Sequence, residues 1–202
     1  MGDHIDLNRR SFLKRVGAGA ALAAAAPAVV RGVDLTADPV RVGHIGIGTR
    51  GWDLIRYTGA VDSAKVVAVC DVYKPHVQRG VEAAKNPDVK TYVDYHDLLS
   101  DPDVEAVVIA APDHWHEQMV LDAVQAGKDI YCEKGWTMSI DAAKRMRAAV
   151  KKGDTVMQLG HQGRQYPAAT AGGDMIREGK LGPLTLVKTG RYCNSPADQP
   201  VW

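Results

Sequence analysis

The sequence lacks the features that mark a metalloprotein or a nucleic-acid-binding protein. Only three of its 202 residues are cysteines. None of the three, Cys70, Cys132 and Cys193, stands in a CxxC or zinc-like spacing, so we expect small apolar residues rather than metal ligands. Lysine and arginine number 25 against 24 aspartates and glutamates, a formal net charge of +1, which argues against binding to a phosphate backbone. We therefore expect no metal site and no nucleic-acid partner.

The first 30 residues carry the features of an export signal. The sequence NRRSFLK at positions 8–14 precedes an uncharged apolar run over 16–30, which is shorter than the about 20 residues that a membrane-spanning helix needs. We predict a twin-arginine signal peptide over residues 1–30 and a linker over 31–38. The chain would then be exported by the twin-arginine (Tat) machinery to the periplasm, without stable membrane insertion. Two surface arginines ahead of a buried helix are the alternative.

A glycine-rich loop follows the first predicted strand. Residues 40–45 predict a strand that runs into the sequence GIGTRG at positions 46–51 and then into a helix over 52–58. In a dinucleotide site the first glycine allows a tight turn, the second lets the backbone approach the pyrophosphate, and the third lets the helix pack on the strand. The helix N-terminus adds unpaired N–H groups for the phosphates. The predicted cofactor-binding residues of this loop are Gly46, Ile47, Gly48, Arg50 and Gly51.

A second buried strand ends in a carboxylate at the expected distance. The apolar run over 66–70 is typical of a strand buried on both faces of a parallel sheet, and Asp71 follows it, 20 residues after Gly51 (71 − 51). A carboxylate there accepts hydrogen bonds from the adenosine ribose and repels a 2′-phosphate, which favours NAD over NADP. Lys74, three residues further on, leaves NADP as an alternative cofactor. The alternative for Asp71 is a role in a turn or as a helix cap.

Strands and helices alternate along the rest of the chain. The pattern predicts strands over 91–93, 104–111, 130–132 and 154–159, and helices over 74–85, 95–100, 115–126 and 139–152. This alternation implies an α/β fold, a doubly wound parallel Rossmann sheet over residues 39–162 that binds ligands at the carboxyl ends of its strands. A helix over 168–176 and a strand over 184–189 would begin a second α/β domain in residues 163–202.

Polar residues follow the fourth and fifth predicted strands. His114 and His116 are spaced like metal ligands, but positions i and i+2 of a helix point apart, so we expect core or pocket histidines. After the fifth strand, Lys134 would lie beside a nicotinamide and act as a general base, with its pKa lowered by desolvation. Glu133 would orient Lys134 or bind the cofactor, although such a pair on its own is more often a surface ion pair.

These sequence blocks together resemble a known family. The sequences GIGTRG, CDVYKPH, APDHWH, YCEKGWTMSI and LGHQGR occur in this order and resemble the glucose-fructose oxidoreductase/inositol dehydrogenase/MocA (Gfo/Idh/MocA) family, especially its twin-arginine-exported branch. The resemblance implies a Rossmann domain followed by a substrate-binding and oligomerisation domain. It also implies hydride exchange between NAD or NADP and a secondary alcohol of a sugar or polyol.

The resemblance assigns further site residues. It implies that the loop glycines hold the pyrophosphate and that Asp71 holds the adenosine ribose. It also makes Lys134 the catalytic residue. The remaining matched positions are Pro112 and His116 for the nicotinamide half, Glu133 and Lys134 for the family's Glu-Lys-Pro motif, and Gln162 and Arg164 for the mouth of the substrate pocket.

Two departures from the family pattern affect these expectations. Gly135 stands where the motif has proline, which leaves the direction of Lys134 less defined. Members of the family are considerably longer than this chain, so residues 163–202 are expected to be the beginning of a C-terminally truncated domain. Homo-oligomerisation is expected for a full-length relative.

Two other functions stay open at this point. One is a glycoside hydrolase that uses bound NAD for transient oxidation of its sugar. The other is a catalytically inactive dinucleotide-binding fragment. The sequence does not name the sugar or polyol.

Overall fold

Six short strands form in residues 38–188, the part of the chain that the computed structural model describes. The predicted signal peptide, most of the linker and residues 189–202 lie outside this part. Within it, no helix is both long and apolar enough to cross a membrane. The strands are β1 (Val40–Ile45), β2 (Ala64–Cys70), β3 (Lys90–Tyr92), β4 (Ala106–Ile109), β5 (Asp129–Glu133) and β6 (Met157–Gly160).

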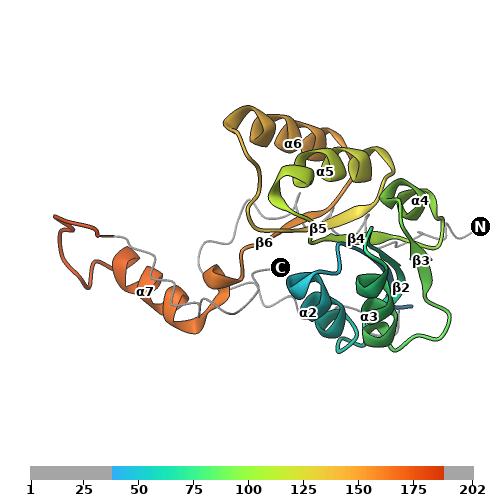
Figure 1. Ribbon diagram of the computed structural model, residues 1–202. Coiled ribbons are helices and arrows are strands. Elements are labelled where there is room, and N and C mark those ends of the chain that lie inside the picture. Colours follow the sequence, from blue (N-terminus) through green and yellow to red (C-terminus); the bar gives the residue numbers. More distant parts are fainter. Residues whose placement is uncertain (1–37, 189–202) are drawn as a thin grey trace, which may run out of the picture. The chain divides into compact units, whose positions relative to one another are not determined.

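All six strands are parallel and lie in the order β3-β2-β1-β4-β5-β6. This is the strand order of a dinucleotide-binding Rossmann sheet, in which the direction of winding reverses between β1 and β4. The predicted doubly wound parallel sheet is therefore confirmed (Figure 1).

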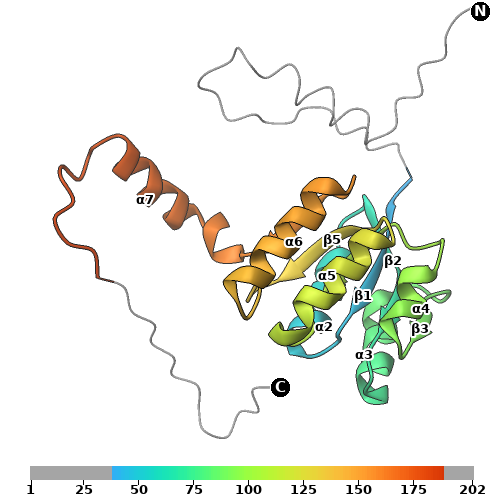
Figure 2. The same ribbon diagram turned by 90° about the horizontal axis from the view of Figure 1, so that it is seen from above.

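Helices cover both faces of the sheet, as Figures 1 and 2 show from two sides. On one face, Ile55 of α2 and Ala84 of α3 pack with Val69 of β2. On the other face, Leu98 of α4 and Val120 of α5 pack with strand residues of β1, β4 and β5. Each fully buried aliphatic side chain of this kind contributes about 1.5–3 kcal/mol. The helices are α2 (Thr49–Thr58), α3 (Lys74–Ala84), α4 (Tyr95–Ser100), α5 (His116–Gln125), α6 (Ile140–Lys152) and α7 (Pro167–Arg177).

The helix ends follow from local chemistry. The Ser139 hydroxyl accepts a hydrogen bond from the Ala142 N–H at 3.1 Å and caps α6. Gly127 follows α5 with φ = +69°, the left-handed conformation that commonly ends a helix. The helix predicted from Trp115 begins instead as a 3₁₀ turn over Asp113–Trp115, and α5 follows at His116.

The predicted strand over 184–189 is wrong in its described part. Residues 184–188 have no regular secondary structure, and the preceding helix α7 buries none of its residues. A strand needs a partner for its backbone N–H and C=O groups. Within residues 38–188 the sheet already ends at β6 on that side, and nothing pairs with this segment.

A buried polar cluster closes the end of α4. The Lys128 ammonium is buried and donates to the carbonyl oxygens of Asp101 and Val104 at 2.9 and 2.7 Å. The Asp101 carboxylate accepts hydrogen bonds from Lys90 at 2.9 Å and from the Tyr92 hydroxyl at 2.8 Å. Burial alone would raise the pKa of Asp101, but the hydrogen bonds from the Asp103 N–H, Lys90 and Tyr92 outweigh it and lower the pKa to about 2.

The Asp101 cluster makes stability depend on pH. A carboxyl group whose pKa is depressed by folding stabilises the fold above its unfolded pKa and loses that contribution as the pH falls toward the folded value. We expect Asp101→Asn to lower the free energy of unfolding by about 2 kcal/mol at neutral pH, measured by urea denaturation. The difference from the wild type should shrink between about pH 4 and pH 2. Asp103→Asn, an exposed partner of Lys90, is the control with a small effect; equal losses in both variants would contradict the role of Asp101.

Candidate functional site

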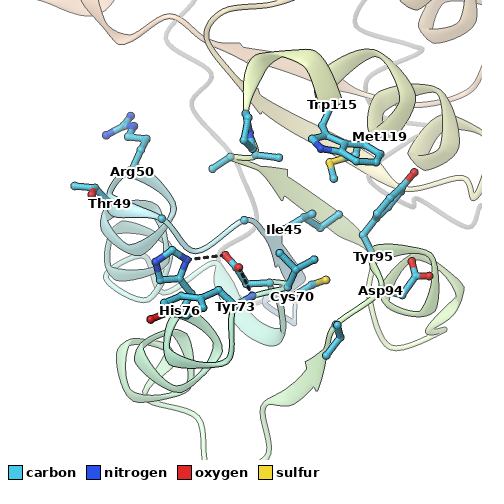
Figure 3. A pocket seen from close by; sticks show the side chains of 18 of the residues that line it. Ile45, Thr49, Arg50, Cys70, Tyr73, His76, Asp94, Tyr95, Trp115 and Met119 are labelled. Carbon is cyan, nitrogen blue, oxygen red and sulfur yellow. Dashed lines mark hydrogen bonds and ion pairs between the residues drawn. The ribbon is translucent and has the colours of Figure 1, made fainter. Parts of the chain in front are cut away.

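A pocket of about 1220 Å³ opens at the carboxyl edge of the sheet (Figure 3). It is lined by the segments that follow β1, β2, β3 and β4, on both sides of the point where the strand order reverses. Ligands of doubly wound sheets bind at this point. The volume exceeds the range of about 300–1,000 Å³ usual for small-molecule pockets, so the pocket has room for an extended ligand.

The glycine-rich loop turns tightly against β4. Gly46 has φ = +85°, and a Cβ built on it would lie 2.8 Å from backbone atoms of Ala110. A Cβ on Gly51 would lie 1.9 Å from the Gly46 carbonyl oxygen. Both glycines are therefore required by the protein's own backbone. A Cβ on Gly48 would meet no described atom within 4 Å, so the space that Gly48 leaves open is on the pocket side.

Helix α2 directs its N-terminus into the pocket. Its N-cap residue is Gly48, which provides no side-chain capping bond. The first N–H groups of the helix have no intrahelical partner, and Gly48, Thr49 and Arg50 line the pocket. Unpaired N–H groups with the positive end of the helix dipole form an anion site.

The Asp71 carboxylate binds the loop and the start of α3. It accepts a hydrogen bond from the Ile47 N–H at 2.7 Å and from the Tyr73 N–H at 2.9 Å. It also lies 3.2 Å from Nδ1 of His76, whose contact is marked by a dashed line in Figure 3. The Ile47 side chain is fully buried, and the Arg79 guanidinium donates to the Ile47 carbonyl oxygen. Ile47 therefore joins the loop to β2 and α3 instead of presenting a side chain to the pocket.

Arg50 and Glu133 form an ion pair across the switch point. Arg50 Nε donates to the Glu133 carboxylate at 2.7 Å, and Glu133 is only 3% exposed. Burial opposes the Arg50 charge, but the hydrogen bond and the attraction to Glu133 outweigh it and raise the pKa of Arg50. The second oxygen of Glu133 accepts from the Lys134 backbone N–H at 3.2 Å. Glu133 therefore holds α2 and the backbone at Lys134, rather than the Lys134 ammonium.

His116 braces two loops from a buried position. It is fully buried; its Nδ1 lies 2.7 Å from the Gly135 carbonyl oxygen and its Nε2 lies 2.9 Å from that of Ala111. His116 does not line the pocket, whereas Pro112 does. The geometry gives His116 a bracing position between the ends of β4 and β5, and its contact with a cofactor stays a prediction.

Lys134 and the substrate-side residues lie at the same edge of the sheet, outside the pocket lining. Lys134 directly follows β5 and is exposed, so residues 38–188 do not supply the desolvation expected for it. Glu133 pairs with Gly160, the last residue of β6, which places Gln162 and Arg164 just beyond the same edge in a 3₁₀ turn. Their roles, and the catalytic role of Lys134, stay predictions.

The sequence reasoning missed one wall of the pocket. Tyr95, His96, Trp115 and Met119 line it, with the Tyr95 and Trp115 ring centroids 6.5 Å apart. Tyr95 and His96 begin α4, Trp115 ends the 3₁₀ turn before α5, and Met119 lies in the first turn of α5. The carboxyl end of β3 faces the same crevice as those of β1 and β2, so this position in a doubly wound sheet was the available signal.

Residues 38–188 contain neither a reactive cysteine nor a cluster of metal ligands. Cys70 and Cys132 are buried, and burial raises the pKa of each thiol to about 12. Within residues 38–188, no three His, Cys, Asp or Glu side chains lie close enough together to hold a metal ion. A thiol of this kind is unreactive, since the thiolate is the nucleophilic form.

Both the sequence and the fold of this chain are similar to those of known oxidoreductases. The sequence model of an oxidoreductase family with an NAD-binding Rossmann fold, GFO_IDH_MocA, matches residues 40–161. The chain belongs to the Gfo/Idh/MocA oxidoreductase family. An inositol 2-dehydrogenase of Saccharopolyspora erythraea is 37% identical over 150 residues, which are 73% of this chain and 44% of that protein.

Among the solved structures of similar fold, one contains NAD(H) and another contains NADP. A scyllo-inositol dehydrogenase from Lactobacillus casei with bound NAD(H) and scyllo-inositol matches with a TM-score of 0.66 at 22% identity, over 72% of this chain and 43% of that one. A 3-ketoreductase from Actinomadura kijaniata in complex with NADP matches with a TM-score of 0.64 at 25% identity, over 70% and 44%. The chain thus spans less than half the length of these relatives.

The Gly135 departure from the Gfo/Idh/MocA motif has a steric counterpart. A Cβ on Gly135 would lie 3.0 Å from Oδ2 of Asp113, which is closer than ordinary van der Waals contact. The Gly135 carbonyl oxygen is also the partner of His116. Because this contact is with the end of the Asp113 side chain and not with backbone, a Cβ at position 135 would require only a small shift of that carboxylate.

The pocket fits the dinucleotide that binds to members of the Gfo/Idh/MocA family. Gly48 leaves open space beside an uncapped helix N-terminus, which suits a pyrophosphate. The Asp71 carboxylate lines the same pocket and offers an acceptor for a ribose hydroxyl. The residues that would hold the cofactor are Gly46, Gly48, Thr49, Arg50, Asp71 and Pro112.

The two pocket glycines should respond differently to the same substitution. We expect Gly46→Ala to lower the free energy of unfolding by about 2 kcal/mol, because its Cβ meets backbone at a positive φ. Gly48→Ala should leave stability unchanged and weaken NAD binding by about tenfold or more, because its methyl group enters the pocket. Thermal unfolding and NAD titration of both variants measure this contrast. A Gly48→Ala protein that binds NAD normally would contradict the phosphate-binding role.

Proposed function

We propose that this protein is an NAD-dependent oxidoreductase that moves hydride between the nicotinamide and a secondary alcohol of a cyclic polyol or sugar. The observation that carries the proposal is the Asp71 carboxylate in a pocket that also contains an uncapped helix N-terminus and a glycine cradle. The inositol dehydrogenases among its relatives support a polyol as the substrate class.

The reaction needs a hydride acceptor and a base on the alcohol. A bound nicotinamide supplies the hydride chemistry. As the carbonyl forms from the alcohol, the hydroxyl proton must move to a protein group, and the Lys134 amine at the end of β5 is the group we assign to it. Glu133, held by Arg50 at 2.7 Å, would keep the backbone at Lys134 in place through its bond to the Lys134 N–H.

The substrate is proposed to bind beside Lys134, with Gln162 and Arg164 at the mouth of its site. This is supported by the position of all three residues beyond the carboxyl ends of β5 and β6. In this proposal the polyol-binding surface is completed by protein beyond residues 38–188, and a homo-oligomer is the proposed assembly. For the location we propose the periplasm after twin-arginine export, supported by the sequence NRRSFLK and the apolar run that follows it.

The cofactor preference should depend on the Asp71 carboxylate. A 2′-phosphate carries about −1.5 to −2 charge at neutral pH, so Asp71 would repel NADP. We expect Asp71→Ala to weaken NAD binding about tenfold and to narrow the difference between NAD and NADP. Titration followed by tryptophan fluorescence measures both affinities, since Trp115, one of four tryptophans, lines the pocket.

Asp88→Ala, a change of an exposed carboxylate outside the pocket lining, is the matched control for Asp71→Ala. The preference proposal fails if NADP binds more tightly than NAD to the wild type, or if the Asp71 variant discriminates as the wild type does.

Substitution of Lys134 should lower turnover without weakening cofactor binding. We expect Lys134→Met to reduce the rate of NADH formation with inositols or sugars by about 10²-fold or more, while NAD affinity stays within about threefold. Lys152→Met, at the exposed end of α6, is the control. Equal turnover by the Lys134 variant and the wild type would rule out its role as the base.

A further inference from the structure

The Asp71 carboxylate has most of its acceptor capacity in use. An ionised carboxylate offers about four lone-pair sites. The Ile47 N–H and His76 Nδ1 take the two on Oδ2, and the Tyr73 N–H takes one on Oδ1. One acceptor site remains, on Oδ1. The adenosine ribose of a dinucleotide carries two neighbouring hydroxyl groups, so Asp71 alone accepts a hydrogen bond from only one of them.

His76 is held in position beside this remaining site. Its Nδ1 lies 3.2 Å from Asp71 Oδ2, and its ring packs edge-on against Tyr73 with centroids 4.9 Å apart. The imidazole also lines the pocket, and its side chain is 30% exposed. Figure 3 shows the His76 ring beside Tyr73, on the side of the pocket formed by α3. Two contacts therefore preset the ring before any ligand binds.

The bond to Asp71 decides the chemistry of the other ring nitrogen. An ionised carboxylate only accepts hydrogen bonds, so the proton of this pair is on Nδ1 of His76. In the neutral imidazole Nε2 is then an acceptor. Nε2 makes no hydrogen bond to any other residue in the range 38–188. It offers the second acceptor that a ribose diol requires.

We propose that His76 is a second residue that binds the adenosine ribose. One ribose hydroxyl donates a hydrogen bond to Asp71 Oδ1, and the neighbouring hydroxyl donates one to His76 Nε2. The proposal rests on the proposed function, because it requires the dinucleotide to bind in this pocket. It goes further in dividing ribose recognition between two side chains. His76 is thereby a binding residue in its own right, as well as a support for Asp71.

The test combines ligand and protein changes in one cycle. The full chain, as wild type and as His76→Ala, is titrated with NAD, 2′-deoxy-NAD and 3′-deoxy-NAD. We expect His76→Ala to weaken NAD binding about threefold to tenfold, the effect of one neutral hydrogen bond. Both deoxy analogues should bind the wild type more weakly than NAD, one because it lacks the hydroxyl that donates to Asp71 and the other because it lacks the hydroxyl that donates to His76. Only the analogue that lacks the hydroxyl bound by His76 should lose nothing further in His76→Ala, and its identity shows which hydroxyl His76 binds.

A second substitution separates direct contact from support of Asp71. In His76→Asn the shorter amide can still donate to Asp71 from about the position of Nδ1, but no atom replaces Nε2. We expect the Asn variant to behave like the Ala variant in the cycle. Gln78→Ala, an exposed polar residue of the same helix, is the matched control and should bind all three ligands as the wild type does.

The outcomes distinguish this proposal from the proposed function. If the folded wild type does not bind NAD, the cofactor site and the role of His76 both fall. If NAD binds but His76→Ala weakens both analogues by the same factor as NAD, so that the ligand and protein changes act independently, only the role of His76 falls. Full recovery of NAD affinity in His76→Asn would reduce His76 to a support of Asp71 and would also overturn the proposal.

Discussion

The close approach of the first loop to the neighbouring strands is the constraint on which the site depends. Where β1 ends, the Ala110 backbone just after β4 leaves no room for a side chain on Gly46, and the Gly46 carbonyl oxygen leaves none on Gly51. The Asp71 carboxylate then takes the Ile47 N–H of this loop at 2.7 Å. These contacts join β1, β2 and β4 at one point and aim the N-terminus of α2 into the pocket. The phosphate and ribose contacts that we propose both depend on that placement.

Several charged residues that the sequence offers as ligands also hold the protein together. Arg50 lines the pocket and is tied to the buried Glu133, and Asp71 has three protein donors. Burying a carboxylate without a hydrogen-bond partner destabilises the fold. Internal hydrogen bonds therefore hold Glu133 and Asp71 in fixed positions. This use of the same groups for folding and for binding means that the site is organised without its ligand.

The sequence predicted the fold and half of the pocket for clear physical reasons. A parallel strand buried on both faces gives an apolar run such as residues 66–70, and a turn that must avoid β4 demands glycine at fixed positions. Both signals are local in the sequence. The aromatic wall of Tyr95 and Trp115 was missed because its residues meet only when α4 and α5 pack on the same face of the sheet. The strand predicted over 184–189 was wrong over residues 184–188, because within the described part of the chain no strand pairs with this apolar segment.

The sequence by itself determined the element order, the glycine loop and the carboxylate at the end of β2, because each depends on residues close along the chain. Only the tertiary structure decided which groups these residues meet. In the folded protein the Glu133 carboxylate pairs with Arg50 and not with the Lys134 ammonium. The buried His116 ring contacts the carbonyl oxygens of Ala111 and Gly135, and the His76 ring contacts the Asp71 carboxylate. These partners come from different strands and helices, and parallel strands bring their ends to one edge only after the whole sheet has formed.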